Sequence, residues 1–248
     1  MNITKLVALI LQQAPPIQQP PPVQPQAPTT FWNGPAANWF VAISTLALAF
    51  VAVFQEWIKS LFFKPALDID VRAERPFAEK TWFDANTEVY YFRLAVTNTG
   101  RKAAENVQVY AHAVRRKKLD RKYEAVDRFT PMAMRWTHKG VGTLPYLLPD
   151  MPPAYCDLGH ISDPARKGGT FESLDDVPAD QTVFVLETEV NPKSKGNLLG
   201  PGEYYIYLKV AASNCPPRDF KVKIKTPKGQ WFADEDRMFR DGIGLSLG

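Results

Sequence analysis

The chain has 248 residues, of which 45% are hydrophobic and 23% are charged, and its formal net charge is +4. These proportions are ordinary for a folded protein and argue against wholesale disorder. The small net charge argues against a dedicated nucleic-acid-binding domain, which normally carries a strong basic excess. Two cysteines, Cys156 and Cys215, are too few for a disulfide scaffold.

The first 35 residues are rich in proline and glutamine, as in "QQAPPIQQPPPVQPQAPTT" at 12–30. Proline forbids regular helix and favours extended polyproline II segments, so we treat residues 1–35 as a disordered spacer, with docking to an aromatic groove as the alternative. The preceding "LVALIL" at 6–11 is short for a signal-peptide core and no clear cleavage site follows it. No signal peptide is therefore predicted.

Residues 36–64 are predicted to form a transmembrane helix with an interfacial extension. No charged residue occurs between Ala36 and Phe54, and about twenty residues at 1.5 Å each span a hydrocarbon core of roughly 30 Å. Trp32 and Trp39 flank one end of the run and Trp57 the other, where aromatic rings prefer the membrane interface. The alternative is a core helix that is apolar on all sides.

Basic residues flanking the helix predict its orientation. Only Lys5 precedes the helix, whereas Lys59, Lys64, Arg72, Arg75 and Lys80 follow it. Because basic flanks are retained in the cytoplasm, we expect a single-pass cell-membrane protein with its N-terminus outside and its C-terminal domain inside. The reverse orientation remains the second hypothesis.

Apolar and polar residues alternate with a period of two after Pro65, and this pattern predicts β-strands. It is clearest in "EVYYFRLAVTN" (88–98), "NVQVYAHAV" (106–114), "TVFVLETEV" (182–190), "EYYIYLKVA" (203–211) and "DFKVKIK" (219–225). The side chains expected to face the core are Tyr90, Phe92, Leu94, Val96, Val107, Val109, Ala111, Ala113, Phe184, Leu186, Tyr204, Ile206, Leu208, Val210, Phe220, Val222 and Ile224.

Further strands are expected at 67–71, near Cys156, near Trp231 and at 243–247, which brings the total to seven to nine. Half-buried strands separated by Gly, Pro and Asn turns are typical of an antiparallel β-sandwich. The predicted fold class is therefore mainly β, with one transmembrane helix followed by a β-sandwich domain at 65–248.

Two motifs resemble a known class of domain. "VTNTGRKAAENVQV" (96–109) and "LLGPGEYYIYLKV" (198–210) resemble turns and strands of bacterial immunoglobulin-like, CARDB-like domains. The resemblance implies an immunoglobulin-like sandwich in which Asn98 and Gly100 form a turn and Tyr204 is a tyrosine corner. It implies little about function, because this fold carries many unrelated roles. The segment 117–171 is longer and less regular than in that class.

The densest charge lies in "RRKKLDRKYEAVDR" (115–128), which carries a net charge of +4 from seven basic and three acidic residues. Alternating strand directions place it far from the helix, with Arg101 and Lys102 in a turn nearer the bilayer. A solvated loop, a docking site for an acidic protein, and a site for lipid or nucleic acid are the three interpretations. The candidate partner-binding residues are Arg115, Arg116, Lys117, Lys118, Arg121 and Lys122.

Catalytic and metal-binding patterns are weak. "CDLGH" supplies Cys156 and His160, but metal sites need three or four ligands and a Cys-His nucleophile needs an orienting third group. The acidic clusters "SLDDVPAD" and "FADEDRMFRD" are explained by turn formation. We therefore expect no metal, no cofactor and no enzymatic activity, with a metal-dependent activity in 117–171 as a minor alternative.

The segment "KGQWFADEDRMF" (228–239) mixes aromatic and charged residues. We expect its aromatic side chains to cap one end of the sandwich, and an exposed anchor for a partner is the alternative. Together these features predict a membrane-tethered binding or adaptor domain for a protein partner, with small molecules and nucleic acids disfavoured as ligands. The alternative is an exported structural or adhesive module of the cell envelope, which a Cys156–Cys215 disulfide would favour.

Overall fold

The computed structural model describes residues 35–83, 87–166 and 174–248. The predicted tail at 1–35, apart from its last residue, and the interfacial Trp32 lie outside these ranges. The chain divides into two compact units, 1–55 and 56–248.

Helix α2 (Pro35–Phe62) contains an 18-residue stretch, Asn38–Gln55, that is long and apolar enough to cross a membrane. None of this stretch is buried within the structure, which argues against the core-helix alternative. Trp39 and Trp57 are both mostly exposed. The helix ends three residues before Pro65, whose ring cannot continue it.

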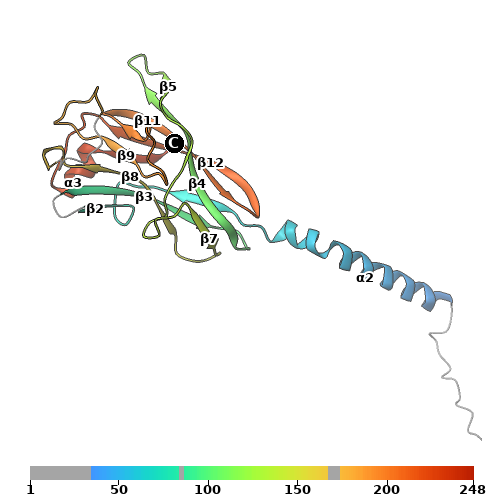
Figure 1. Ribbon diagram of the computed structural model, residues 1–248. Coiled ribbons are helices and arrows are strands. Elements are labelled where there is room, and N and C mark those ends of the chain that lie inside the picture. The colour runs from blue at the N-terminus through green and yellow to red at the C-terminus, as the bar shows by residue number, and fades with distance from the viewer. Residues whose placement is uncertain (1–34, 84–86, 167–173) are drawn as a thin grey trace, which may run out of the picture. The chain divides into compact units, whose positions relative to one another are not determined.

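The rest of the described chain is mainly β and forms two antiparallel sheets (Figure 1). Sheet A contains β1 (Leu67–Asp70), β2 (Ala78–Trp82), β3 (Glu88–Asn98), β8 (Ala154–Ser162), β9 (Phe184–Leu186) and β10 (Leu198–Leu199). Sheet B contains β4 (Ala104–Lys117), β5 (Tyr123–Ala125), β6 (Met132–Ala133), β7 (Thr143–Leu147), β11 (Gly202–Ala212), β12 (Cys215–Thr226) and β13 (Gly244–Leu247). Short helical turns are η1 (Pro164–Arg166), α3 (Glu235–Arg237) and η2 (Met238–Gly242).

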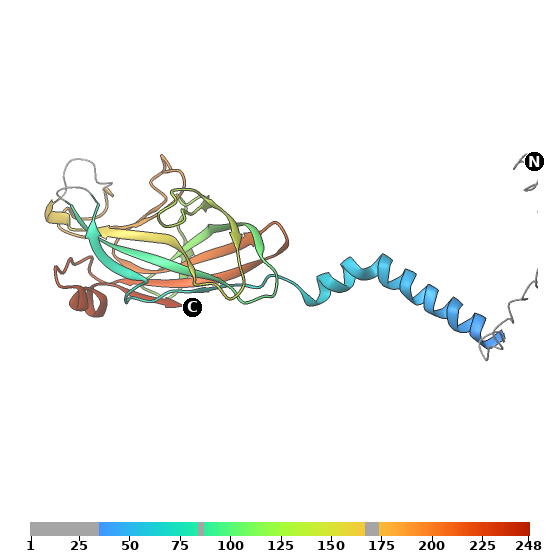
Figure 2. The same ribbon diagram turned by 90° about the horizontal axis from the view of Figure 1, so that it is seen from below.

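One hydrophobic core lies between the two sheets, because alternate residues of each strand point to the same side. The core side chains predicted for β3, β9 and β11 are all buried, as are Val222 and Ile224 of β12. Phe220 is only partly buried at the edge of this core. Figure 2, seen from below, also shows the two layers of strands.

The prediction for Ala113 of β4 is wrong, and a β-bulge is the reason. Tyr207 of β11 pairs with Ala113 while Leu208 pairs with Ala111, so His112 is an extra residue on β4. The extra residue reverses the alternation. Val114 consequently enters the core and Ala113 does not, and Arg115 and Lys117 lie on the outer face.

A strap at residues 132–137 pairs with both sheets. On sheet B, the Met134 amide donates to the Val109 carbonyl at 2.8 Å. On sheet A, the Thr137 amide donates to the Tyr155 carbonyl at 2.9 Å, and the backbone of Trp136 forms an antiparallel β-bridge with that of Cys156. The strap thus closes one side of the core, where Met134 and Trp136 are almost fully buried.

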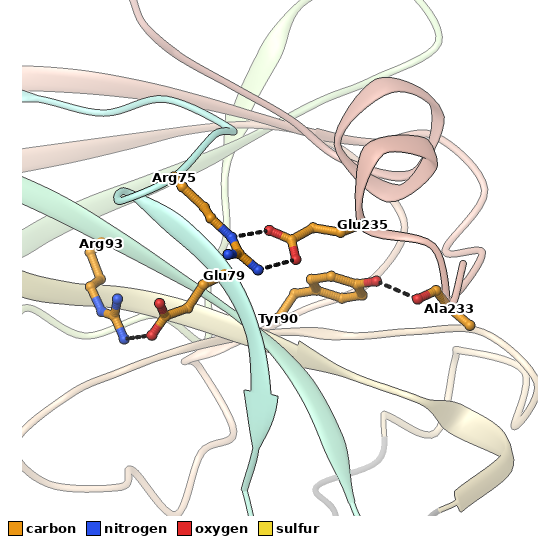
Figure 3. A network of polar contacts seen from close by, with 6 residues as sticks. All are labelled: Arg75, Glu79, Tyr90, Arg93, Ala233 and Glu235. Atoms are coloured by element: carbon orange, nitrogen blue, oxygen red, sulfur yellow. Dashed lines mark hydrogen bonds and ion pairs between the residues drawn. The ribbon is translucent and has the colours of Figure 1, made fainter.

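The C-terminal segment caps the core, as expected. Trp231 packs on Tyr90 with ring centroids 4.8 Å apart, and Phe239 contacts both Tyr90 and Phe92. The Tyr90 hydroxyl donates to the Ala233 carbonyl at 3.2 Å, and Arg75 forms a bidentate ion pair with Glu235 through two hydrogen bonds (Figure 3). The predicted strand near Trp231 is wrong, because this segment leads into α3 and follows the core surface instead.

Candidate binding surface

The predicted basic segment forms a hairpin in which β4 continues into β5. Figure 1 shows the hairpin extending beyond the rest of sheet B. At its tip the Lys118 amide donates to the Lys122 carbonyl at 2.8 Å, and Arg121 adopts a left-handed φ of 67°. Leu119 at the tip is 106% exposed, as much as in an unfolded chain. The hairpin therefore presents one apolar side chain among basic ones.

Strand directions agree with the expected position of this hairpin in the domain. Leu67 pairs with Asn98, so β3 ends beside the start of β1, and β4 then leads away from that point for 14 residues. At about 3.3 Å per residue this is a span of roughly 45 Å. The basic hairpin and the beginning of the domain thus lie at opposite ends of β4.

Most of the six predicted partner-binding residues already have partners inside the domain. The Arg116 guanidinium donates to the Pro201 carbonyl at 2.9 Å and lies over the buried Tyr204 ring, 5.7 Å from its centroid. Lys118 forms an ion pair with Glu124, and Lys122 lies 3.8 Å from Asp120. Arg116 is therefore in part structural, whereas the ion pairs at the tip are largely exposed and weak.

The outer face of sheet B extends this surface. We name it the tyrosine–lysine face and define it by Arg115, Lys117, Tyr123, Glu203, Tyr205, Tyr207, Lys221 and Lys223. Residues 203, 205 and 207 point outward because 204, 206 and 208 point into the core. The pairing of β11 with β4 and β12 brings cations from both neighbouring strands beside its tyrosines.

Aromatic rings and cations alternate across this face. Tyr123 and Tyr205 are 4.4 Å apart between centroids, and the Lys221 ammonium lies 4.4 Å from the Tyr205 ring. The Arg115 guanidinium lies 5.5 Å from the Tyr207 ring. A cation is attracted to the face of an aromatic ring by about 0.5 to 1 kcal/mol at exposed sites, which favours the arrangement of both groups seen on this face.

Glu203 holds three side chains of the tyrosine–lysine face in place. Its carboxylate accepts from Lys223 at 2.8 Å, from Lys117 at 3.0 Å and from the Tyr123 hydroxyl. The hydrogen bond from Lys223, followed by that from Tyr123, lowers the pKa of Glu203 to about 2. Burial and the same hydrogen bond raise the pKa of Tyr123 above its ordinary value. The carboxylate is therefore ionised at neutral pH and fixes three side chains.

The charge of this face suits an acidic ligand. Among its eight residues, Arg115, Lys117, Lys221 and Lys223 supply four positive charges and Glu203 one negative charge, leaving +3. Tyrosine and arginine are enriched at the centres of protein interfaces. Sequence reasoning missed this face, although the tyrosines and lysines at outward positions of "EYYIYLKVA" and "DFKVKIK" carried a signal for it.

The outer face of sheet A carries a polar depression of about 350 Å³. Arg93 donates to Glu79 at 2.6 Å (Figure 3) and lies 3.7 Å from Asp157, which accepts from the Thr137 hydroxyl. Burial raises the pKa of Asp157. His160 contacts Glu187 at 2.7 Å on the same face. The Arg93 guanidinium is thus paired with two carboxylates of its own domain, which favours a structural role for this network.

The remaining chemical candidates do not converge. Cys156 is fully buried in the core, where desolvation raises the pKa of its thiol, whereas His160 belongs to the outer network. Both cysteines are free thiols. Within 35–83, 87–166 and 174–248, no cluster of three or more His, Cys, Asp or Glu side chains is arranged to hold a metal ion.

The structural residues predicted from the turn motif are closely packed. The Asn98 carboxamide accepts from the Ala66 amide at 3.1 Å and donates to the Leu147 carbonyl at 2.9 Å. A Cβ on Gly100 would lie 2.2 Å from the Lys64 carbonyl oxygen, so only glycine fits there. Tyr204 is 3% exposed and its ring contacts Arg116. Its role as a tyrosine corner stays a prediction.

No family model, no curated protein and no solved structure matches this chain.

Proposed function

We propose that this protein is a membrane-anchored, non-enzymatic binding domain that holds an acidic segment of a protein partner at the membrane. The observation that carries the proposal is the tyrosine–lysine face, with its surplus of +3 and its preorganised rings. The exposed Leu119 at the hairpin tip adds an apolar contact beside it. Function on β scaffolds commonly resides in such exposed elements.

The anchor in this proposal is α2. Its stretch Asn38–Gln55 has the length and composition of a membrane span, and an exposed apolar helix of this length is unfavourable in water. The surplus of basic residues after the helix favours a cytoplasmic domain. For the domain itself we propose an immunoglobulin-like sandwich of the CARDB-like class, supported by two antiparallel sheets around one core.

Orientation can be tested by cysteine accessibility on intact cells. Thr30→Cys and Lys195→Cys are introduced separately in a chain that also carries Cys215→Ser, and an impermeant thiol reagent is applied. Labelling at position 30 without labelling at 195 is expected. The opposite pattern would place the domain outside and support the envelope-module alternative.

The binding mode follows from the geometry of the face. Carboxylates of an acidic segment would meet the Arg115 guanidinium and the Lys221 ammonium, which are held over tyrosine rings. Charge-assisted hydrogen bonds to such groups are roughly twice as strong as neutral ones. Leu119 would contact an apolar side chain at the end of the same segment.

Site-specific photo-crosslinking in the native membrane tests this function. A photoreactive residue replaces Leu119, and Val190 serves as a matched position because it is also an exposed apolar residue. We expect a discrete adduct from position 119 and none from 190, with the crosslinked peptide carrying a net negative charge. Arg115→Glu with Lys221→Glu should abolish the adduct.

The matched control is Lys139→Glu with Lys193→Glu, which changes the charge equally at exposed positions outside the face. Adduct formation should persist in this control. Equal adducts from both positions, persistence in the double variant on the face, or a crosslinked peptide with no negative charge would overturn the proposal.

A further inference from the structure

A pocket of about 590 Å³ lies at the beginning of the domain. Its lining includes Lys59, Lys64 and Lys102, together with Phe63, Pro65 and Pro216, and no acidic side chain is among the lining residues that the structure describes. All of these residues belong to the compact unit 56–248. The pocket therefore combines a positive charge with an apolar wall.

Backbone hydrogen bonds fix two walls of this pocket to each other. The Arg101 amide donates to the Lys64 carbonyl at 3.1 Å, and Gly100 permits this approach. Asn98 binds the Ala66 amide and the Lys102 carbonyl with the two ends of its carboxamide. Lys64 and Lys102 are thus carried by segments that are held together.

The β11–β12 turn supplies the third wall. The Asn214 carboxamide accepts from the Glu105 amide at 3.1 Å and donates to the Ala103 carbonyl at 2.8 Å. The Ser213 amide donates to the Glu105 carbonyl at 2.8 Å. The walls formed by Lys102 and by the β11–β12 turn are therefore hydrogen-bonded to the sheets, so this part of the pocket is preformed.

Chain length places this pocket close to the membrane interface if α2 spans the bilayer, a premise taken from the proposed function. Lys59 follows the apolar stretch by four residues, which is roughly 6 Å along a helix. Phe63 is 50% exposed despite being apolar. Aromatic rings and lysine side chains near the end of a span are typical of the headgroup region.

We propose that this pocket binds the headgroup of an anionic phospholipid in the leaflet from which α2 emerges. The phosphate lies among the three ammonium groups, and Phe63 and the prolines contact the glycerol and upper acyl carbons. A lysine near an anionic surface favours that surface over a neutral one by about fivefold. This site is separate from the tyrosine–lysine face, and a lipid bound there would restrict the orientation of the domain relative to the membrane.

Native mass spectrometry of the full chain tests this inference. The protein is reconstituted in nanodiscs with equal parts of phosphatidylcholine and phosphatidylglycerol, and the lipids retained after release are identified. We expect retention of phosphatidylglycerol over phosphatidylcholine by at least about fivefold. Lys64→Gln with Lys102→Gln should remove this preference.

The matched control is Lys118→Gln with Lys122→Gln, an equal charge change at the hairpin tip, and it should retain the preference. Equal retention of both lipids, or an undiminished preference in the pocket variant, would overturn the inference. A third outcome would also overturn it. If inorganic phosphate protects Lys64 and Lys102 against an acylating reagent in neutral nanodiscs, and the protein shows no preference for anionic lipid, the pocket is a site for free phosphate.

The outcome also separates this inference from the proposed anchor. A chain that does not remain with the nanodisc in size-exclusion chromatography contradicts the membrane anchor itself. A chain that remains with the nanodisc but shows no lipid preference contradicts only the headgroup site.

Discussion

On the outer face of sheet A, the Arg93 guanidinium lies between the carboxylates of Glu79 and Asp157, and His160 contacts Glu187. On the tyrosine–lysine face of sheet B, Lys117 and Lys223 pair with Glu203, whereas Arg115 and Lys221 lie over tyrosine rings. Both faces arise from the same alternation of inward and outward side chains. The two faces therefore share a strand pattern and differ in how their charges are paired and buried, which distinguishes a structural face from one suited to binding.

The largest effect is expected from Arg93→Met on sheet A. The Arg93 side chain is 12% exposed and that of Asp157 19%, so the substitution leaves two half-buried carboxylates without their cation. Because Glu79 is more exposed, we expect a loss of about 2 kcal/mol, below the roughly 3 to 5 kcal/mol of fully buried pairs. Urea unfolding of the full chain in detergent measures it.

Lys209→Met on sheet B is the control for that experiment. Its ion pair with Asp219, at 2.8 Å, is largely exposed, so its loss should change the free energy of unfolding by less than about 0.5 kcal/mol. A similar loss in both variants would show that the two faces do not differ in how their charges contribute to stability.

A smaller effect is expected from Glu203→Gln, which removes the charge that holds Lys117, Lys223 and Tyr123. We expect a loss of about 1 kcal/mol at neutral pH, since hydrogen bonds to a charged group near the surface are partly screened. Denaturant unfolding midpoints of the wild type and Glu203→Gln at neutral pH measure this loss. Glu124→Gln, which removes a carboxylate from an exposed ion pair, is the control.

The pH dependence of that difference tests whether ionisation of Glu203 is responsible for it. The folded state lowers the pKa of Glu203 from its ordinary 4.5 to about 2, so folding favours the ionised form. The stabilisation is present above pH 4.5 and is lost as the pH falls toward 2. The wild type and Glu203→Gln should therefore converge in stability over this window. A constant difference would contradict the role assigned to the carboxylate.

The smallest effect on stability is expected from Arg115→Ser with Lys221→Ser. Both cations lie on the outer face of sheet B, each over a tyrosine ring, so the free energy of unfolding should change by no more than about 0.5 kcal/mol, as for most surface substitutions. The adduct formed from position 119 should nevertheless disappear. A loss of stability comparable to that of Arg93→Met would show instead that the tyrosine–lysine face is structural.

The strands with strong alternation could be predicted from the sequence. β3 occupies the predicted residues 88–98, and β11 differs from its prediction by one residue at each end. The strand β2 was missed, because "AEKTW" has one fully buried side chain and no apolar alternation. The strap was missed for a related reason, since its pairing with two sheets follows from tertiary contacts and not from a local period.

The candidate site could be predicted only in part. The basic residues of the hairpin were visible as a run of charge, but the bulge at His112 decides which of them face outward. The tyrosine–lysine face combines β4, β5, β11 and β12, and its assembly depends on the order and register of strands that are distant in sequence. The pairing of β4 with β11, which are about 90 residues apart, cannot be deduced from either strand alone.

The strap at 132–137 gives the domain a mechanical property. A load applied at the start of β1 enters sheet A, whereas the hairpin belongs to sheet B. Because Met134 is bonded to one sheet and Thr137 to the other, tension passes between the layers through short peptide links in addition to side-chain packing. We therefore expect the strap to oppose sliding of the two layers past each other.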